Sequence, residues 1–335
     1  MVIWLGFAAL ILLLLALDLG VFHRHAHVVS PREGLAWSVI WTTLSLLFAV
    51  FIYHGFEHQW FGLGTSPDPI DGALNTGWSA LVKYLTGYVV EQSLSIDNMF
   101  VIAMLFRFFA VPAAYQHRVL FWGILGALAL RGVMIAIGTA LVSQFAWVLY
   151  IFGGFLILTA VKMLFLDIEG SDPRTNIVVR LTRKLFPVTK KFHRHKFVLR
   201  RRGKWLLTPL ALALVMVETT DVIFAVDSIP AIFAITADPF LVFASNAFAI
   251  LGLRSLYFVL AGALTAFRYL KVSLAIVLAM VGTKMLAHHW LKEWLGEYFN
   301  LWVLGAILLV LTAGTISSLL VTVAETPARL TKRDG

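Results

Sequence analysis

Long runs of apolar side chains alternate with short polar segments along almost the whole of this chain of 335 residues. A run of about 20 apolar residues matches the hydrocarbon core of a bilayer, so each such run predicts a transmembrane helix. We therefore expect an all-α fold, a polytopic bundle of about nine transmembrane helices. The predicted segments are 2–22, 34–55, 77–106, 115–141, 145–165, 206–235, 240–264, 271–289 and 300–322.

Two pairs of acidic residues interrupt this apolar pattern. Glu91 and Asp97 lie in one predicted helix, and Asp221 and Asp227 lie in another, with the same spacing of six residues. A carboxylate at the centre of a bilayer costs about 3 kcal/mol or more, so an ionisable residue there is a candidate functional residue. Together with the polar residues beside them, the candidate set is Glu91, Asp97, Asn98, Glu218, Asp221, Asp227 and Ser228.

The acidic helices also belong to an internal repeat. Asp227 follows Asp97 by 130 residues, and an arginine and a lysine recur further along each unit. Each unit has three helices, an odd number, so the second unit runs the opposite way across the membrane, as in many secondary transporters. The predicted organisation is 1–76 with two helices, 77–165 with the first unit, 166–205 as a basic cytoplasmic loop, 206–289 with the second, inverted unit, and 290–335 with the last helix and a cytoplasmic tail.

Positive charge is concentrated in one inter-helix segment, because twelve Lys and Arg lie between Arg174 and Lys204. The net charge of +9 therefore indicates membrane topology and contact with anionic lipids, and not nucleic acid binding. The positive-inside rule places this loop in the cytoplasm, with the N-terminus outside and the C-terminus inside a bacterial inner membrane. The chain has no cysteine, which excludes disulfides, thiolate metal sites and a cysteine nucleophile.

The relative positions of the four carboxylates depend on whether their helices are continuous. On an unbroken helix, two residues six apart are rotated by about 240° around the helix axis, so they face different sides. Asn98, seven residues after Glu91, lies on the same face as Glu91. Pro230 favours a break in the second acidic helix. Local unwinding near Ser95 and Ala225 would bring all four carboxylates to one cavity at the midplane. The sequence leaves both geometries open.

Carboxylate, amide and hydroxyl oxygens suit hard divalent ions such as Mn²⁺, Mg²⁺ or Ca²⁺. Buried carboxylates without a cation would largely be protonated, so the site implies metal binding, proton carriage or an exchange of the two. The basic residues of the repeat are candidates for charge compensation: Arg131, Arg254, Lys162 and Lys284. The rival interpretation is that the acids only form structural ion pairs with these residues. Lys162 and Lys284 would then extend to an interface, where we also place Asp18.

Four strings carry a resemblance to a known family: EQSLSIDNMFV at 91–101, VETTDVIFAVDSIPAIFAIT at 217–236, DPFLVFASNAFAILGLRSLYF at 238–258 and GTKML at 282–286. The chain resembles the TerC/Alx family of the LysE-type exporter superfamily, and within it the Alx-like members, over about residues 30–325. The resemblance implies manganese efflux, with tellurite resistance in some members and a response to alkaline pH in others. It implies site roles for Glu91, Asp97, Asn98, Glu218, Asp221 and Asp227.

The leading hypothesis is thus a membrane transporter that exports divalent metal cations, Mn²⁺ first, with protons as candidate counter-ions. The alternatives are a transporter of another cation such as Ca²⁺, or a non-transporting membrane partner that assists metalation or assembly of exported proteins. An intramembrane protease with Asp97 and Asp227 as its dyad is disfavoured, because the carboxylates come as duplicated pairs and no G-x-G-D string is present. We expect no enzyme activity, no permanently bound cofactor, and an indirect origin for any tellurite resistance.

Overall fold

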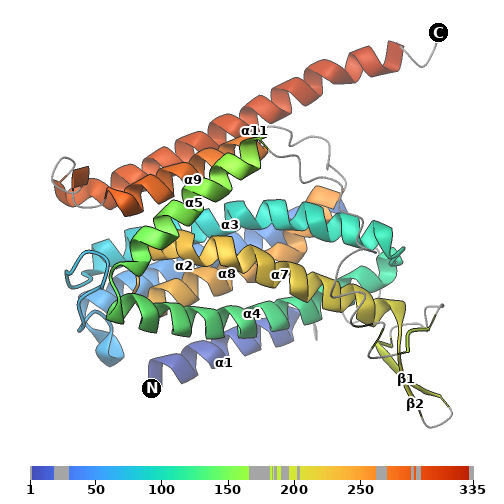
Figure 1. The fold of residues 1–335 in the computed structure, drawn as a ribbon, viewed down its shortest axis with the longest axis horizontal. Coiled ribbons are helices and arrows are strands. Elements are labelled where there is room, and N and C mark those ends of the chain that lie inside the picture. Colours follow the sequence, from blue (N-terminus) through green and yellow to red (C-terminus); the bar gives the residue numbers. More distant parts are fainter. Residues whose placement is uncertain are drawn as a thin grey trace.

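The computed structural model describes residues 2–18, 30–165, 196–201, 204–261, 270–287 and 296–331, with a few isolated residues between these ranges. They form an all-α bundle in which every predicted span is present as a helix (Figure 1). The helices are α1 Val2–Leu17, α2 Pro31–Glu57, α3 Gly77–Phe108, α4 Ala113–Gln144, α5 Val148–Phe165, α7 Pro209–Phe233, α8 Pro239–Ala261, α9 Leu270–Leu286 and α11 Phe299–Thr331. The short elements are the 3₁₀ helices η2 (Trp60–Gly62) and η4 (Gly296–Tyr298) and the hairpin of β1 (Val198–Arg201) and β2 (Lys204–Leu207).

Seven of the described helices are long and apolar enough to cross a membrane: α2, α3, α4, α5, α7, α8 and the first 20 residues of α11. The described parts of α1 and α9 have 16 and 17 residues, slightly short of the roughly 20 that a full span requires. The chain is therefore an essentially all-α, polytopic integral membrane protein.

Three of the helices that build the bundle begin at a hydroxyl N-cap. The side chains of Ser30, Thr76 and Thr208 each accept a hydrogen bond from the backbone amide three residues later. α2 and α7 also have a proline directly after the cap, where the missing N–H costs nothing. These polar residues between apolar runs fix where the helices start.

Helices of the first three-helix unit pack against helices of the second. α3 packs on α8 of the other unit, and α7 correspondingly packs on α4. α5 packs along α9, and the two acidic helices α3 and α7 contact each other. This is the pattern that a two-fold relation between the units would produce. α5 and α9 approach closely at two glycines: a Cβ atom on Gly282 would lie 2.9 Å from the carbonyl oxygen of Gly153.

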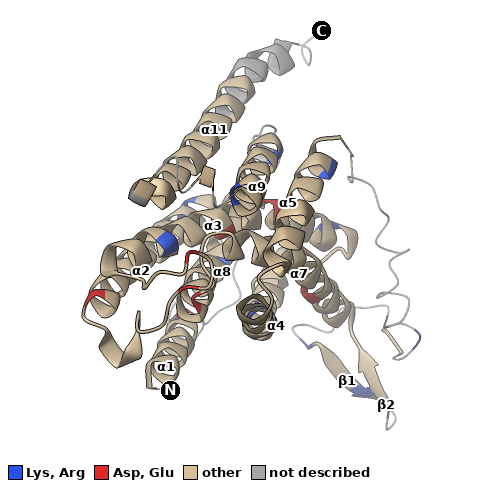
Figure 2. Cartoon of the chain, turned by 60° about the vertical axis from the view of Figure 1, so that its left-hand side comes forward, with Lys and Arg blue, Asp and Glu red and all other residues tan. Residues whose placement is uncertain are grey.

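The two ends of the bundle carry different structures (Figure 1). The end with the β1–β2 hairpin, where α7 begins, is called the hairpin end. The opposite end, with the 58–76 loop and the turn between α7 and α8, is called the loop end. Charged residues also lie among the helices between these ends (Figure 2). The lipid contact predicted for the basic 166–205 loop concerns residues that mostly lie outside those described.

Both acidic helices are continuous, so the unwinding considered near Ser95 and Ala225 is wrong for this structure. Pro230 lies inside α7, three residues before the helix ends at Phe233. A proline so close to the end of a helix removes one backbone hydrogen bond without interrupting the turns that carry Asp221.

Candidate functional site

Because α3 and α7 are continuous, each acidic pair is divided between two places. Glu91 and Asp221 lie against Arg131 of α4, whereas Asp97 and Asp227 line a cavity beside α5. Of the two geometries that the sequence left open, the structure therefore has the one in which the four carboxylates do not converge on one point. Among the residues that the structure describes, no three His, Asp or Glu are grouped so that they could hold one metal ion.

Arg131 joins four helices through its guanidinium. Nη1 donates to Glu91 Oε1 of α3 in a short ion pair and to Asn246 Oδ1 of α8 at 2.9 Å. Nη2 donates to Asp221 Oδ1 of α7 at 3.3 Å. The side chain is fully buried, so its charge is compensated by these partners and not by water. A planar guanidinium can serve several acceptors in this way, which a lysine ammonium does less well.

The second place is a cavity of about 440 Å³ between α3, α5, α7 and α9. Its polar lining comes from both acidic helices and from α5: Asp97, Asn98, Asp227, Ser228, Thr159 and Lys162. Thr159 Oγ1 donates to Asp227 Oδ1 at 3.1 Å. The second halves of α5 and α7, the middle of α3 and the first half of α9 contribute to the wall, so the cavity lies in the middle part of the bundle. A groove of about 500 Å³ between α1, α2 and α8 has an apolar lining and offers no ligand for a cation.

Several carboxylate oxygens near Arg131 have no hydrogen-bond donor among the described residues. They are Glu91 Oε2, Asp221 Oδ2 and Glu218 Oε2, and the hydroxyl of Ser228 is in the same condition. The Glu218 carboxylate lies against Gly126 of α4, where a Cβ atom would collide with it. Buried acceptors without a donor are rare, and they indicate a bound cation, a proton or ordered water.

The equivalent basic residues of the two units have different surroundings. Arg254 Nη2 donates to Asp18 Oδ1 at 2.8 Å, and both side chains are buried, so Asp18 forms an ion pair inside the bundle at the end of α1. Lys162 is exposed and lines the acidic cavity. Lys284 is buried and donates to Asn300 Oδ1 at 2.9 Å, so it does not extend to an interface. Arg131 forms ion pairs with an acid of each unit, Glu91 and Asp221.

The sequence reasoning missed Asn246, Thr159 and Lys83. Asn246 is a single amide in the apolar helix α8, and Thr159 lies one turn before Lys162. Lys83 is a single cation near the start of an acidic helix, and it is 1% exposed. A search for every isolated polar residue inside a predicted span would have found all three.

Comparison with known proteins gives one family and several relatives. The family described as "Integral membrane protein TerC family" matches residues 76–326. The "Uncharacterized membrane protein STKORF319" of Myxococcus xanthus is 49% identical over 283 residues, covering 84% of this chain and 82% of that protein. The "Putative membrane-bound redox modulator Alx" of Escherichia coli K12 is 46% identical over 285 residues, 85% of each chain. An "Uncharacterized membrane protein" of Rickettsia bellii is 39% identical over 307 residues, 92% of this chain and 94% of that one. No solved structure matches.

Proposed function

This chain belongs to the TerC family of integral membrane proteins, and on that premise we propose that it exports divalent metal cations, with Mn²⁺ as the leading substrate. The observation that carries the proposal is the cavity inside the bundle that Asp97 and Asp227 line together, one from each repeat unit. Ionisable residues inside a bilayer are costly and rare, and they mark ion pathways and proton relays.

The ligands around this cavity fit a cation that is carried and released. Hard ions such as Mg²⁺ bind through one or two carboxylates and keep several waters, and Mn²⁺ prefers the same oxygen ligands. Two carboxylates with nearby hydroxyl groups give such a site, and the volume of about 440 Å³ leaves room for water. A site that released its ion slowly would not support transport, because a transported ion must leave as well as enter. Lys162 supplies positive charge beside the carboxylates when the cation is absent.

The proposed direction of transport, out of the cell, rests on the family resemblance and the predicted topology. In that topology the hairpin end faces the cytoplasm of a bacterial inner membrane. Cations would load from that side and leave at the loop end, by alternating access between the two inverted units. Protons are the proposed counter-ions, and the unpartnered oxygens of Glu218 and Asp221 are candidate proton acceptors. The proposal includes no catalytic step, no permanent cofactor and no nucleic acid.

The test is Mn²⁺ flux in proteoliposomes that contain the purified protein and an internal pH reporter. Asp97→Asn and Asp227→Asn should each lower the flux by about 10-fold or more, since even losing a residue that only supports a metal ligand costs that much. Glu33→Gln is the matched control, because it removes a carboxylate in the first turn of α2, away from the cavity. Its flux should equal that of the unchanged protein.

Two results would overturn the proposal. Unchanged flux in both aspartate variants would remove the cavity from the mechanism. Absence of flux for Mn²⁺, Ca²⁺ and Mg²⁺ from correctly folded protein would favour a membrane partner that assists metalation or assembly of exported proteins.

A further inference from the structure

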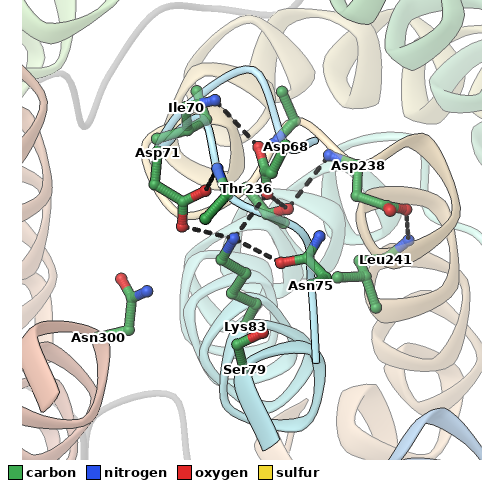
Figure 3. A network of polar contacts seen from close by, with 12 residues as sticks. Asp68, Ile70, Asp71, Asn75, Ser79, Lys83, Thr236, Asp238, Leu241 and Asn300 are labelled. Carbon is green, nitrogen blue, oxygen red and sulfur yellow. Dashed lines mark hydrogen bonds and ion pairs between the residues drawn. The ribbon is translucent and has the colours of Figure 1, made fainter. Parts of the chain in front are cut away.

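A second buried polar cluster lies at the loop end, where the 58–76 loop folds against α3 (Figure 3). Lys83 of α3 is at its centre. Its Nζ lies 2.8 Å from Asp68 Oδ2, 2.8 Å from Asp71 Oδ2 and 2.7 Å from Asn75 Oδ1. Three oxygens of one loop thus hold an ammonium group that has no access to solvent.

Asp68 extends this cluster to the second repeat unit. Its carboxylate accepts a short hydrogen bond from the Thr236 hydroxyl and another from the backbone N–H of Ala237, at 3.0 Å. Burial raises the pKa of Asp68, but the charge of Lys83 and the donated hydrogen bonds outweigh burial and hold this pKa below its ordinary value. Asp68 is therefore ionised at neutral pH, and the ion pair with Lys83 persists.

The residues that Asp68 contacts are fixed to α8. The carboxylate of Asp238 accepts hydrogen bonds from the backbone N–H groups of Phe240 and Leu241, at 2.9 and 3.1 Å, and so caps this helix. The N–H of Asp238 donates to the Thr236 hydroxyl at 3.1 Å. The Lys83 network, defined as Lys83, Asp68, Asp71, Asn75 and Thr236, consequently connects α3 of the first unit to the α7–α8 turn of the second.

The Lys83 network lies nearer the loop end than the acidic cavity does. Lys83 precedes Glu91 by eight residues, about 12 Å along α3 at 1.5 Å per residue, on the side of the loop end. The α3 residues that line the cavity, Leu94, Asp97 and Asn98, lie further from that end. A cation that leaves the cavity along α3 towards the loop end moves towards the elements that the network joins.

We propose that the Lys83 network is the gate at the loop end: its ion pairs hold the two units together and close that end, and they part when the cation leaves. This inference rests on the proposed transport function. Buried ion pairs add little stability compared with apolar packing of equal volume, so a purely structural contact would gain nothing from them. They suit a gate, because water that enters on opening hydrates the separated charges and offsets the lost contacts.

The lack of cysteine in the chain makes a first test direct. Thr86 lies almost one turn below Lys83 on α3 and is buried, so Thr86→Cys reports entry of a membrane-impermeant maleimide from the loop end. Adding Lys83→Met should raise the labelling rate about 10-fold or more. A 10-fold increase corresponds to a free energy of opening that is lower by about 1.4 kcal/mol. Lys83→Arg, which keeps the charge, should stay close to the parent. Glu57→Gln is the control, because Glu57 contacts the start of α3 but not the second unit.

The second test closes the gate covalently. The side chains of Asp68 and Thr236 touch, so Asp68→Cys/Thr236→Cys should form a disulfide on oxidation, visible as a gel shift. Oxidised protein should lose Mn²⁺ flux and keep Mn²⁺ binding, and reductant should restore the flux. Equal flux before and after cross-linking, or equally slow labelling of the Lys83→Met and parent proteins, would overturn the gate. Absence of both binding and flux in the folded protein without substitutions would instead overturn the proposed function.

Discussion

Replacing Arg131 should lower the free energy of unfolding strongly. A large part of this loss should come from the Glu91 carboxylate, which is left buried without its partner. The variant Arg131→Gln removes donors to Glu91, Asp221 and Asn246 at once. Both carboxylates then remain inside the membrane without a cation. Removing one partner of a buried ion pair costs about 3–5 kcal/mol, mainly because the other charge is left uncompensated.

The double variant Arg131→Gln/Glu91→Gln separates the ion pair from simple loss of packing. It removes the uncompensated charge on α3, so it should cost about 2 kcal/mol less than the sum of the two single variants. That coupling lies within the range of about 0.5–3 kcal/mol observed for residues of one ion-pair network. The measurement is the free energy of unfolding of all four proteins in mixed micelles, followed by circular dichroism as denaturing detergent is added.

A control cycle pairs Arg131→Gln with Asp71→Asn, because Asp71 forms its ion pair with Lys83, in a different network from that of Arg131. Its two effects should add to within about 0.5 kcal/mol. If the Arg131 and Glu91 effects also add to that precision, the ion pair does not stabilise the bundle and the reasoning fails.

Three further predictions concern packing, pH and the second arginine. Gly282→Ala should destabilise the protein by about 1–3 kcal/mol, because the added Cβ atom would collide with the backbone of α5. Gly154 has open space around it, so the control Gly154→Ala should be neutral or slightly stabilising in the same unfolding assay. Since the pKa of Asp68 is lowered, its ionised form stabilises the fold fully above about pH 4 and progressively less as the pH falls through the native pKa. The difference between wild type and Asp68→Asn should therefore shrink as the pH falls below about 4, and a constant difference would contradict this. Arg254→Gln should lower the melting temperature, and adding Asp18→Asn should recover part of the loss because the two side chains form a buried pair; further loss in the double variant would argue against it.

The fold was predictable because membrane insertion leaves few alternatives to helices. Each apolar run became a helix, and the hydroxyl caps at Thr76 and Thr208 mark the starts of both acidic helices. The spacing of six residues also predicted that Glu91 and Asp97 would face different neighbours if their helix was unbroken. Continuity itself was not predictable, because Pro230 is compatible with either a break or a regular last turn, and only the packing around it decides.

The partners of the basic residues could not be predicted from the repeat. Arg131 and Arg254 occupy matching positions, yet only Arg254 contacts a helix outside the two units, through Asp18 after α1. A sequence repeat specifies the plan of each unit and not the additional helices that pack on it. The contacts of Lys83 with the 58–76 loop could not be predicted either. The three oxygens that contact its ammonium group belong to Asp68, Asp71 and Asn75, which lie in a polar segment without periodicity.

The close approach of α5 and α9 at Gly153 and Gly282 limits how the units can rearrange. Backbone lies against backbone at this crossing, and the side chains of Leu156, Ile157 and Leu286 close tightly around the two glycines, so sliding of one helix along the other would require repacking. Rotation about the crossing point requires less repacking. For the proposed transport cycle we therefore expect a pivot here: spin labels placed near the glycines should keep a constant separation, while labels at the far ends of the same helices should move apart or together.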